Sequence, residues 1–258
     1  MNTIVMQNLT RMGSTLQWTV QPAATNISYS CTWPLPPGQG NISTDPLLID
    51  GEHLAVGSPC RGAGNAVGGI IQDLDGDNWA TPPSIGCDEV VEAGLVGSLE
   101  VGLRVVRTNA VLQGLPLGFL ADVTGRASRI QWGYGDGVVV TNGSWRSDHA
   151  FAQPGIFQVT ITAFNLDRPE GVSTNVTVLI YPVLPPEIRY LTKTENGTML
   201  VFHGQDGQLY ELQGSTNAAL PESWTLLRLI SDRGGGTVVS DSPRTNAQYF
   251  YRVHTRPW

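Results

Sequence analysis

One stretch of the chain decides the fold: Trp132-Gly-Tyr-Gly-Asp-Gly137, then His149-Ala-Phe-Ala-Gln-Pro-Gly155, then Ile156-Phe-Gln-Val-Thr-Ile-Thr-Ala163. Apolar and polar residues alternate in the last run, which is the period of a half-buried strand. The glycines beside Asp136 predict a tight turn, because glycine adopts positive φ without a Cβ clash and an Asp side chain bonds turn N–H groups. The stretch therefore predicts a strand, a glycine turn, and a Pro-Gly corner leading into another strand.

These motifs resemble the PKD domain, an immunoglobulin-like β-sandwich of surface and secreted proteins, over residues 99–181. Phe151 and Phe157 stand where that family often has tyrosine. The resemblance implies a turn role for Asp136 and packing of His149 within the sandwich. The residues that carry the motif are Trp132, Gly135, Asp136, Gly137, His149, Pro154 and Gly155.

Composition limits the classes of protein that fit. The chain has 258 residues, of which 14% are charged, with 30 glycines and 17 prolines, so we expect a turn-rich β protein of two or three small domains. The net charge of −7 and the lack of a basic cluster argue against nucleic acid. No run of about eighteen apolar residues is present, so no membrane span is expected.

The chain divides into three parts, and we expect an all-β fold in each. Residues 1–90 hold short apolar runs broken by Pro, Gly and Asn, and residues 91–183 hold a short linker and the sandwich. The proline-rich run from Pro182 to Pro186 is too poor in N–H donors for a central strand, so it predicts a second linker. Residues 187–258 form a small C-terminal β domain.

The first part is similar to the terminal coils of right-handed parallel β-helix proteins, in segments 29–38, 40–47 and 57–64. The opening segment 2–8 resembles one rung of such a coil. That resemblance implies an uncovered solenoid end with unpaired strand edges, since each coil buries its face on its neighbour. The predicted assembly edge consists of Ile4, Val5 and Met6.

In the last part, the apolar runs 200–202 and 209–212 lie on either side of Gly204-Gln-Asp-Gly207, which predicts a β-hairpin. The pattern resembles a C-terminal β module of secreted bacterial proteins of the Verrucomicrobia–Planctomycetes type. That pattern comprises Tyr210, the run 214–217, Trp224 and the run 250–253.

The three cysteines are Cys31, Cys60 and Cys87. In the extracellular context that the resemblances imply, we expect a Cys60–Cys87 disulfide, with Cys31 left over. Closing that loop would contribute about 3–4 kcal/mol. A buried free thiol is the alternative for each of them.

Candidate ligands concentrate in the run Asp73-Leu-Asp-Gly-Asp77. Asp73, Asp75 and Asp77 offer oxygens to Ca²⁺, and the run also fits a loop in which carboxylates cap backbone N–H groups. No catalytic motif or other cofactor motif is visible. Glycoside hydrolysis needs two carboxyl groups held across a groove, and Asp88 and Glu89 lie instead at the closing turns of the coils.

These observations predict a non-enzymatic, extracellular, modular protein with an adhesion or structural role. We expect its open end to bind another copy of the chain or a different β-rich protein, and a head-to-tail contact between copies would give filaments. The alternative is a carbohydrate-binding appendage of a secreted polysaccharide-degrading enzyme, with glycans as partners.

Overall fold

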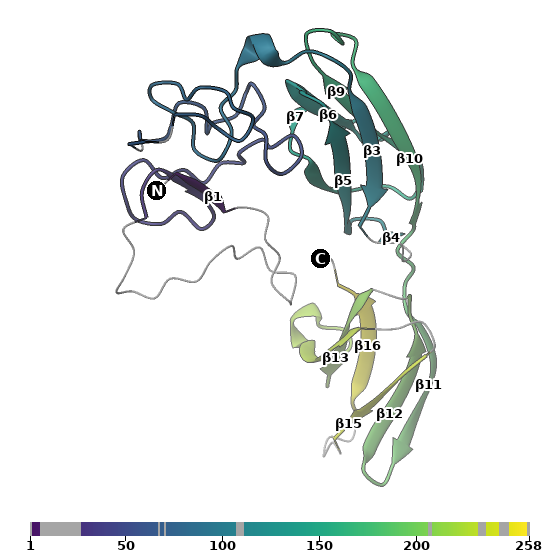
Figure 1. Ribbon diagram of the computed structural model, residues 1–258. Coiled ribbons are helices and arrows are strands. Elements are labelled where there is room, and N and C mark those ends of the chain that lie inside the picture. The colour runs from purple at the N-terminus through teal and green to yellow at the C-terminus, as the bar shows by residue number, and fades with distance from the viewer. Residues whose placement is uncertain are drawn as a thin grey trace. The chain divides into compact units, whose positions relative to one another are not determined.

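The computed structural model describes residues 2–5, 27–66, 68–69, 71–106, 111–205, 208–231, 236–242 and 248–256. Within these ranges the regular secondary structure consists of β-strands and two short 3₁₀ helices, which confirms the prediction of an all-β protein (Figure 1). No helix in these ranges is long and apolar enough to cross a bilayer.

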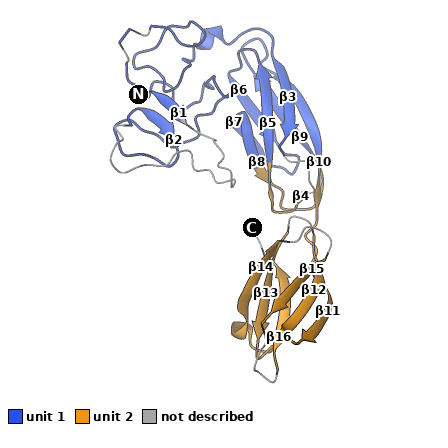
Figure 2. Cartoon of the chain, turned by 60° about the horizontal axis from the view of Figure 1, so that its bottom comes forward, with its two compact units in different colours: residues 1–106, 118–148, 158–177 blue, residues 107–117, 149–157, 178–258 orange. Residues whose placement is uncertain are grey.

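The elements, in chain order, are β1 (Thr3–Val5), β2 (Ser30–Thr32), η1 (Glu92–Gly94), β3 (Glu100–Val105), β4 (Val111–Leu112), β5 (Pro116–Thr124), β6 (Arg129–Gly133), β7 (Val139–Gly143), β8 (Arg146–Ala150), β9 (Gly155–Phe164), β10 (Val172–Tyr181), β11 (Glu187–Thr194), β12 (Gly197–His203), β13 (Leu209–Ser215), η2 (Pro221–Ser223), β14 (Thr225–Ser231), β15 (Thr237–Asp241) and β16 (Phe250–Thr255). The chain forms two compact units, which Figure 2 colours separately. The first comprises residues 1–106, 118–148 and 158–177, and the second comprises residues 107–117, 149–157 and 178–258.

The predicted immunoglobulin-like sandwich is present as two sheets, with strand orders β4-β10-β9-β6-β7 and β3-β5-β8. In β9 the alternation holds, since Val159, Ile161 and Ala163 are buried. Leu117, Phe119, Ala121 and Val123 are buried on β5. The Phe119 ring meets the Trp132 ring of the other sheet at 6.2 Å between centroids, so these aromatics fill the space between the sheets.

The glycine turn has the predicted structure. Trp132 is fully buried, and its Nε1 donates to the Ser144 carbonyl at 2.9 Å. Asp136 Oδ1 accepts the N–H of Val138 at 3.1 Å within the turn. Gly135 has φ +79°, and a Cβ there would lie 2.7 Å from the Gln158 carbonyl oxygen, so only glycine fits without displacement.

His149 packs as the PKD resemblance implied. Its ring meets Phe151 edge-on at 4.7 Å, and Phe151 in turn stacks on Phe157 at 4.6 Å. β9 begins at Gly155, directly after the Pro-Gly corner. This aromatic row anchors the corner that joins β8 to β9.

The N-terminal part of the first unit is mostly irregular, but it contains a parallel stack. β1 pairs with β2 in parallel, with Ile4 opposite Cys31, and Cys31 forms a parallel bridge to Ile42. A small core lies beneath, and Ile4 and Ile42 pack against it. Its buried members are Cys31, Leu48, Leu54, Cys60, Ile85, Val90 and Leu95. Parallel stacking is expected for β-helix coils, and the β-helix itself stays a prediction.

The C-terminal part of the second unit packs two three-stranded sheets, β11-β12-β15 and β14-β13-β16. The predicted hairpin across residues 204–207 is wrong, because β12 and β13 belong to different sheets. Crossing between the sheets places Phe202 and Tyr210 in one core, with their rings edge-on at 5.3 Å. A hairpin joins β11 to β12 instead, where Thr194 pairs with Gly197, and β13 pairs with the next strand, β14.

Candidate functional site

The N-terminal part of the first unit is bonded to the sandwich along several loops. The N–H of Val56 donates to the Ser128 carbonyl at 2.8 Å, and the N–H of Leu166 donates to the Leu95 carbonyl at 2.9 Å. Trp145, half-buried after β7, packs against the N-terminal core. This contact surface therefore joins two parts of the chain that lie far apart in sequence.

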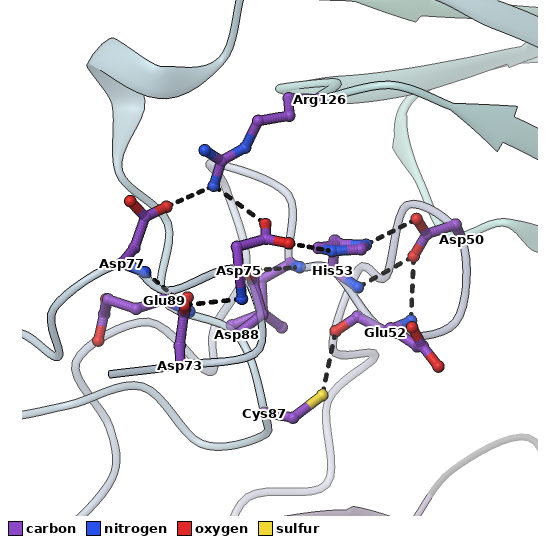
Figure 3. A network of polar contacts seen from close by, with 11 residues as sticks. Asp50, Glu52, His53, Asp73, Asp75, Asp77, Cys87, Asp88, Glu89 and Arg126 are labelled. Carbon is purple, nitrogen blue, oxygen red and sulfur yellow. Dashed lines mark hydrogen bonds and ion pairs between the residues drawn. The ribbon is translucent and has the colours of Figure 1, made fainter. Parts of the chain in front are cut away.

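A cluster of charged side chains lies at this surface and is built on two Asp-capped loops (Figure 3). Asp50 Oδ1 accepts the backbone N–H groups of Glu52 and His53, both at 3.0 Å. Asp73 Oδ1 accepts those of Asp75 and Asp77, at 2.9 and 2.8 Å. The short Asp side chain closes each loop, as it does in Asx turns.

His53 lies between two carboxylates, as Figure 3 shows. Its Nδ1 is 2.7 Å from Asp50 Oδ2, and its Nε2 is 3.4 Å from Asp75 Oδ1. The hydrogen bond with Asp50 raises the pKa of His53 to about 9, against the opposing effect of burial. Burial alone would raise the pKa of Asp50, but the hydrogen bonds from the His53 ring and from backbone N–H groups lower it below its ordinary value.

Arg126, in the turn after β5, connects the cluster to the sandwich. Its Nη2 donates to Asp75 Oδ2 at 3.0 Å and also to the carboxylate of Asp77. Of the three residues predicted for calcium, Asp75 and Asp77 therefore face a guanidinium, and Asp73 caps its own loop. Calcium binding by this run stays a prediction.

Two adjacent carboxylates of the closing turn, Asp88 and Glu89, are both buried, but they accept different numbers of hydrogen bonds. Glu89 is 5% exposed and accepts from Ser84 N, Ser84 Oγ and Ala80 N. Asp88 is 4% exposed, and among the described residues its carboxylate accepts one hydrogen bond, from the N–H of Leu54 at 2.7 Å. Burial raises the pKa of Asp88 above its ordinary value.

A cavity of about 320 Å³ opens beside the cluster. Asp50, His53, Asp75 and Asp88 line it on the N-terminal side, and Val123–Ala127 line it on the sandwich side. Donor atoms of His53, Asp75 and Asp88 all lie within 4.8 Å of one another. The arrangement can bind a proton or a cation at the edge of this cavity.

Sequence reasoning missed His53, Asp50 and Arg126. The local pattern Asp50-Gly-Glu-His53 carried a signal, because an Asp that caps a turn can also reach a histidine three residues on. Arg126 had no such signal, since its partners lie about fifty positions earlier in the chain.

The expected Cys60–Cys87 disulfide is not confirmed. All three cysteines are free thiols; Cys31 and Cys60 are buried, and Cys87 is exposed. The Cys31 thiol donates to the Thr44 carbonyl at 3.3 Å, and its interaction with Cys60, followed by burial, raises the pKa of Cys31. The Cys87 thiol instead donates to the Glu52 carbonyl at 3.6 Å. The fold thus directs Cys60 into the small core and Cys87 toward the surface.

The predicted assembly edge falls on β1. Ile4 and Val5 lie in this strand, and Met6 lies outside the described residues. In the ranges that the structure covers, β1 pairs with β2 alone. The reciprocal hydrogen bonds of Asn2 with Asn65, at 2.7 and 3.0 Å, fix the start of the strand.

The comparison with protein families matches residues 102–178 to the PKD domain. This confirms the PKD resemblance over the sandwich and leaves the flanking parts unassigned. None of the curated proteins matches the chain.

Three solved structures share limited likeness with the chain. The first comes from a study of the promiscuous specificity of carbohydrate-binding modules from the β-sandwich superfamily. It superposes on this chain with a TM-score of 0.31 at 9% identity, and the match covers 62% of this chain and 85% of that one. A cytokine receptor complex gives 0.24 at 14% identity, with 60% and 91% covered. Bacteroides uniformis β-glucuronidase 3 gives 0.23 at 13% identity, with 62% and 25% covered. At such TM-scores none of them assigns a ligand to this chain.

Proposed function

We propose that the chain is a non-enzymatic, extracellular, modular protein with an adhesion or structural role, and that β1 pairs with a strand of another chain. The observation that carries this proposal is the parallel stack of Ile4, Cys31 and Ile42, whose outer strand has one described neighbour. An edge strand presents N–H and C=O groups that can pair with an incoming strand.

The hydrogen bonds of β2 indicate which groups of β1 face outward. Ser30 O and Thr32 N bond to Ile42, on the side of β2 away from β1. Backbone groups alternate in direction along a strand, so the N–H and C=O of Cys31 face β1, where a parallel ladder bonds them to the residues on either side of Ile4. The N–H and C=O of Ile4 itself then point away from β2, to a side of β1 with no partner strand among the described residues.

A second edge strand, β7, offers a place where β1 of another copy could pair. β7 is the last strand of its five-stranded sheet; Val139 and Val140 are exposed in it, as is Val138 directly before it. An exposed apolar edge strand favours pairing with another strand. Contact between β1 of one copy and β7 of the next is heterologous and would propagate into a filament, whereas β1 pairing with β1 across a two-fold axis would close as a dimer.

Electron microscopy and sedimentation velocity over a concentration series test this proposal. We expect assembly that grows with concentration, as filaments for the β1–β7 contact and as dimers for the β1–β1 contact. Monomers that persist at the highest concentration would overturn self-assembly and leave a different β-rich protein as the partner to be tested by strand-peptide binding.

A second candidate function, glycan binding, is favoured by a groove of about 430 Å³ near β1. Trp79, Asn2, Asn78 and Pro83 contribute to its walls. The indole Nε1 of Trp79 donates to the Gln72 carbonyl at 2.9 Å, which fixes the ring. A fixed aromatic ring beside amide groups offers an apolar surface together with hydrogen bonds to a sugar.

A glycan array with the wild-type chain and Trp79→Ala tests the second candidate. Trp33→Ala is the matched control, because Trp33 is exposed and lies outside the residues that line this groove. Binding that is lost in Trp79→Ala and kept in Trp33→Ala would support glycan recognition. The absence of binding by the wild-type chain would exclude the glycans tested.

A further inference from the structure

We infer that His53, Asp75 and Asp88 form a binding site for a divalent transition-metal ion, best suited to Zn²⁺, with an open coordination position toward the adjoining cavity. This site is independent of the pairing proposed for β1. It differs from the predicted calcium run because its ligands come from three separate loops. The donor atoms of the three residues lie within 4.8 Å of one another.

The orientation of His53 is the first argument. Asp50 Oδ2 lies 2.7 Å from Nδ1, which donates to it, and Nε2 faces Asp75 Oδ1 at 3.4 Å (Figure 3). A metal ion bound at Nε2 would displace the proton that this nitrogen carries in the imidazolium form. Histidines that bind metals commonly donate their other ring N–H to a carboxylate, which fixes the tautomer and the ring orientation. Asp50 is thus a positioning residue, itself held by two backbone N–H groups.

The burial of Asp88 is the second, independent argument. This carboxylate lines the cavity, is 4% exposed and, in the described part of the chain, accepts a single hydrogen bond from Leu54. Its neighbour Glu89 is equally buried but accepts three hydrogen bonds. A buried carboxylate normally needs a partner charge or a metal ion, and the groups whose donor atoms lie within 4.8 Å of Asp88 are His53 and Asp75.

The position of Asp75 is the third argument. Arg126 binds its Oδ2 at 3.0 Å, and Oδ1 is left facing His53 Nε2 at 3.4 Å. Two ligands of a tetrahedral zinc ion with bond lengths of about 2.0–2.2 Å are roughly 3.4 Å apart, so this pair already has the required separation. The donor atom of Asp88 lies within 4.8 Å of this pair and would supply the third ligand.

The donor set identifies the class of ion. Calcium takes about six to eight oxygen ligands, and this cluster offers one imidazole nitrogen and two carboxylates. Imidazole with carboxylate suits Zn²⁺ and neighbouring transition metals. Three protein ligands with one position left open, beside a cavity of about 320 Å³, is the arrangement in which zinc can also bind a small molecule or water.

Zn²⁺ titration calorimetry on the whole chain, after treatment with a chelator and dialysis, tests the inference. We expect one Zn²⁺ per chain. His53→Gln and Asp88→Asn should weaken binding by about 100-fold or more, and Asp50→Asn by about 10–100-fold, as is usual for residues that orient a ligand. Glu52→Gln is the matched control, because Glu52 is exposed and lies between Asp50 and His53 in the sequence. This substitution removes the same charge, and the affinity for Zn²⁺ should change by less than about threefold.

Substitution of Co²⁺ for Zn²⁺ adds a readout on the wild-type chain that does not depend on the folding of any variant. A four-coordinate site gives intense visible absorption, and we expect this band to disappear on addition of excess Zn²⁺. Failure of the wild-type chain to bind stoichiometric Zn²⁺ would overturn the inference. Equal losses in Asp88→Asn and Glu52→Gln would overturn it too, and so would binding abolished by Asp73→Asn but retained in His53→Gln.

Discussion

Arg126, in the sandwich, donates to the carboxylate of Asp75 at 3.0 Å, across 51 positions of sequence. The same guanidinium bonds Asp77, so one side chain ties the aspartate loop to the PKD domain. We expect Arg126→Met to destabilise the fold by about 1 kcal/mol, since the partners are partly exposed and screened by solvent. Chemical unfolding measures this, with Arg104→Met as the control, because Arg104 is exposed and carries the same charge. Equal effects of the two substitutions would contradict the role of Arg126.

The glycine turn of the sandwich gives a prediction with a built-in comparison. Gly135 has φ +79°, and an added Cβ would press on the backbone of Gln158, so Gly135→Ala should cost about 2 kcal/mol or more. Gly133, two residues earlier, has open space where its Cβ would lie. Gly133→Ala should therefore change the free energy of unfolding by less than about 0.5 kcal/mol. Two substitutions of similar cost would show that the turn does not require glycine.

Features of the fold that depend on residues close together in the sequence could be predicted, whereas the pairing of distant strands could not. The alternation in β9 and the capping by Asp136 follow from spacing within a few residues, and both were confirmed. The hairpin predicted across residues 204–207 failed because glycine-rich spacing predicts a turn but does not specify which strand the chain pairs with next.

The charged cluster shows the same limit more strongly. Asp73 could be predicted as a loop cap, since its partners lie two and four residues away. The approach of Asp88 to His53 joins irregular loops, which have no period that could reveal it. The pairing of the cysteines shows the same limit. The sequence prediction left Cys31 without a partner, and in the structure Cys31 interacts with Cys60.

Thiol reactivity should follow the burial of the cysteines. A maleimide added to the native chain should label Cys87, which is exposed, while Cys31 and Cys60 react only after unfolding. Labelling at Cys87 should be slow near neutral pH, because partial desolvation of the thiol and, after it, nearby carboxylates raise its pKa. Peptide mapping by mass spectrometry identifies the labelled sites. A linked Cys60–Cys87 peptide without reductant would show that the predicted disulfide forms after all.

The stability of the metal-free chain should depend on the protonation of His53. The folded-state pKa is raised from its ordinary value of 6.5 to about 9 by Asp50. The stabilisation is then fully present below about pH 6.5, and it is lost as the pH rises toward 9. With a chelator present, the melting temperature of wild type should exceed that of His53→Gln at pH 6, and the gap should close by pH 10. A gap that is independent of pH would mean that His53 contributes by packing alone.

Sedimentation velocity of Ile4→Pro beside Ile4→Ala tests the proposed assembly edge most directly. Both substitutions remove the side chain that packs on the N-terminal core, but only proline removes the N–H of β1 that points away from β2. We expect wild type and Ile4→Ala to associate as concentration rises, while Ile4→Pro stays monomeric. Association of Ile4→Pro to the same extent as Ile4→Ala would contradict pairing through this edge.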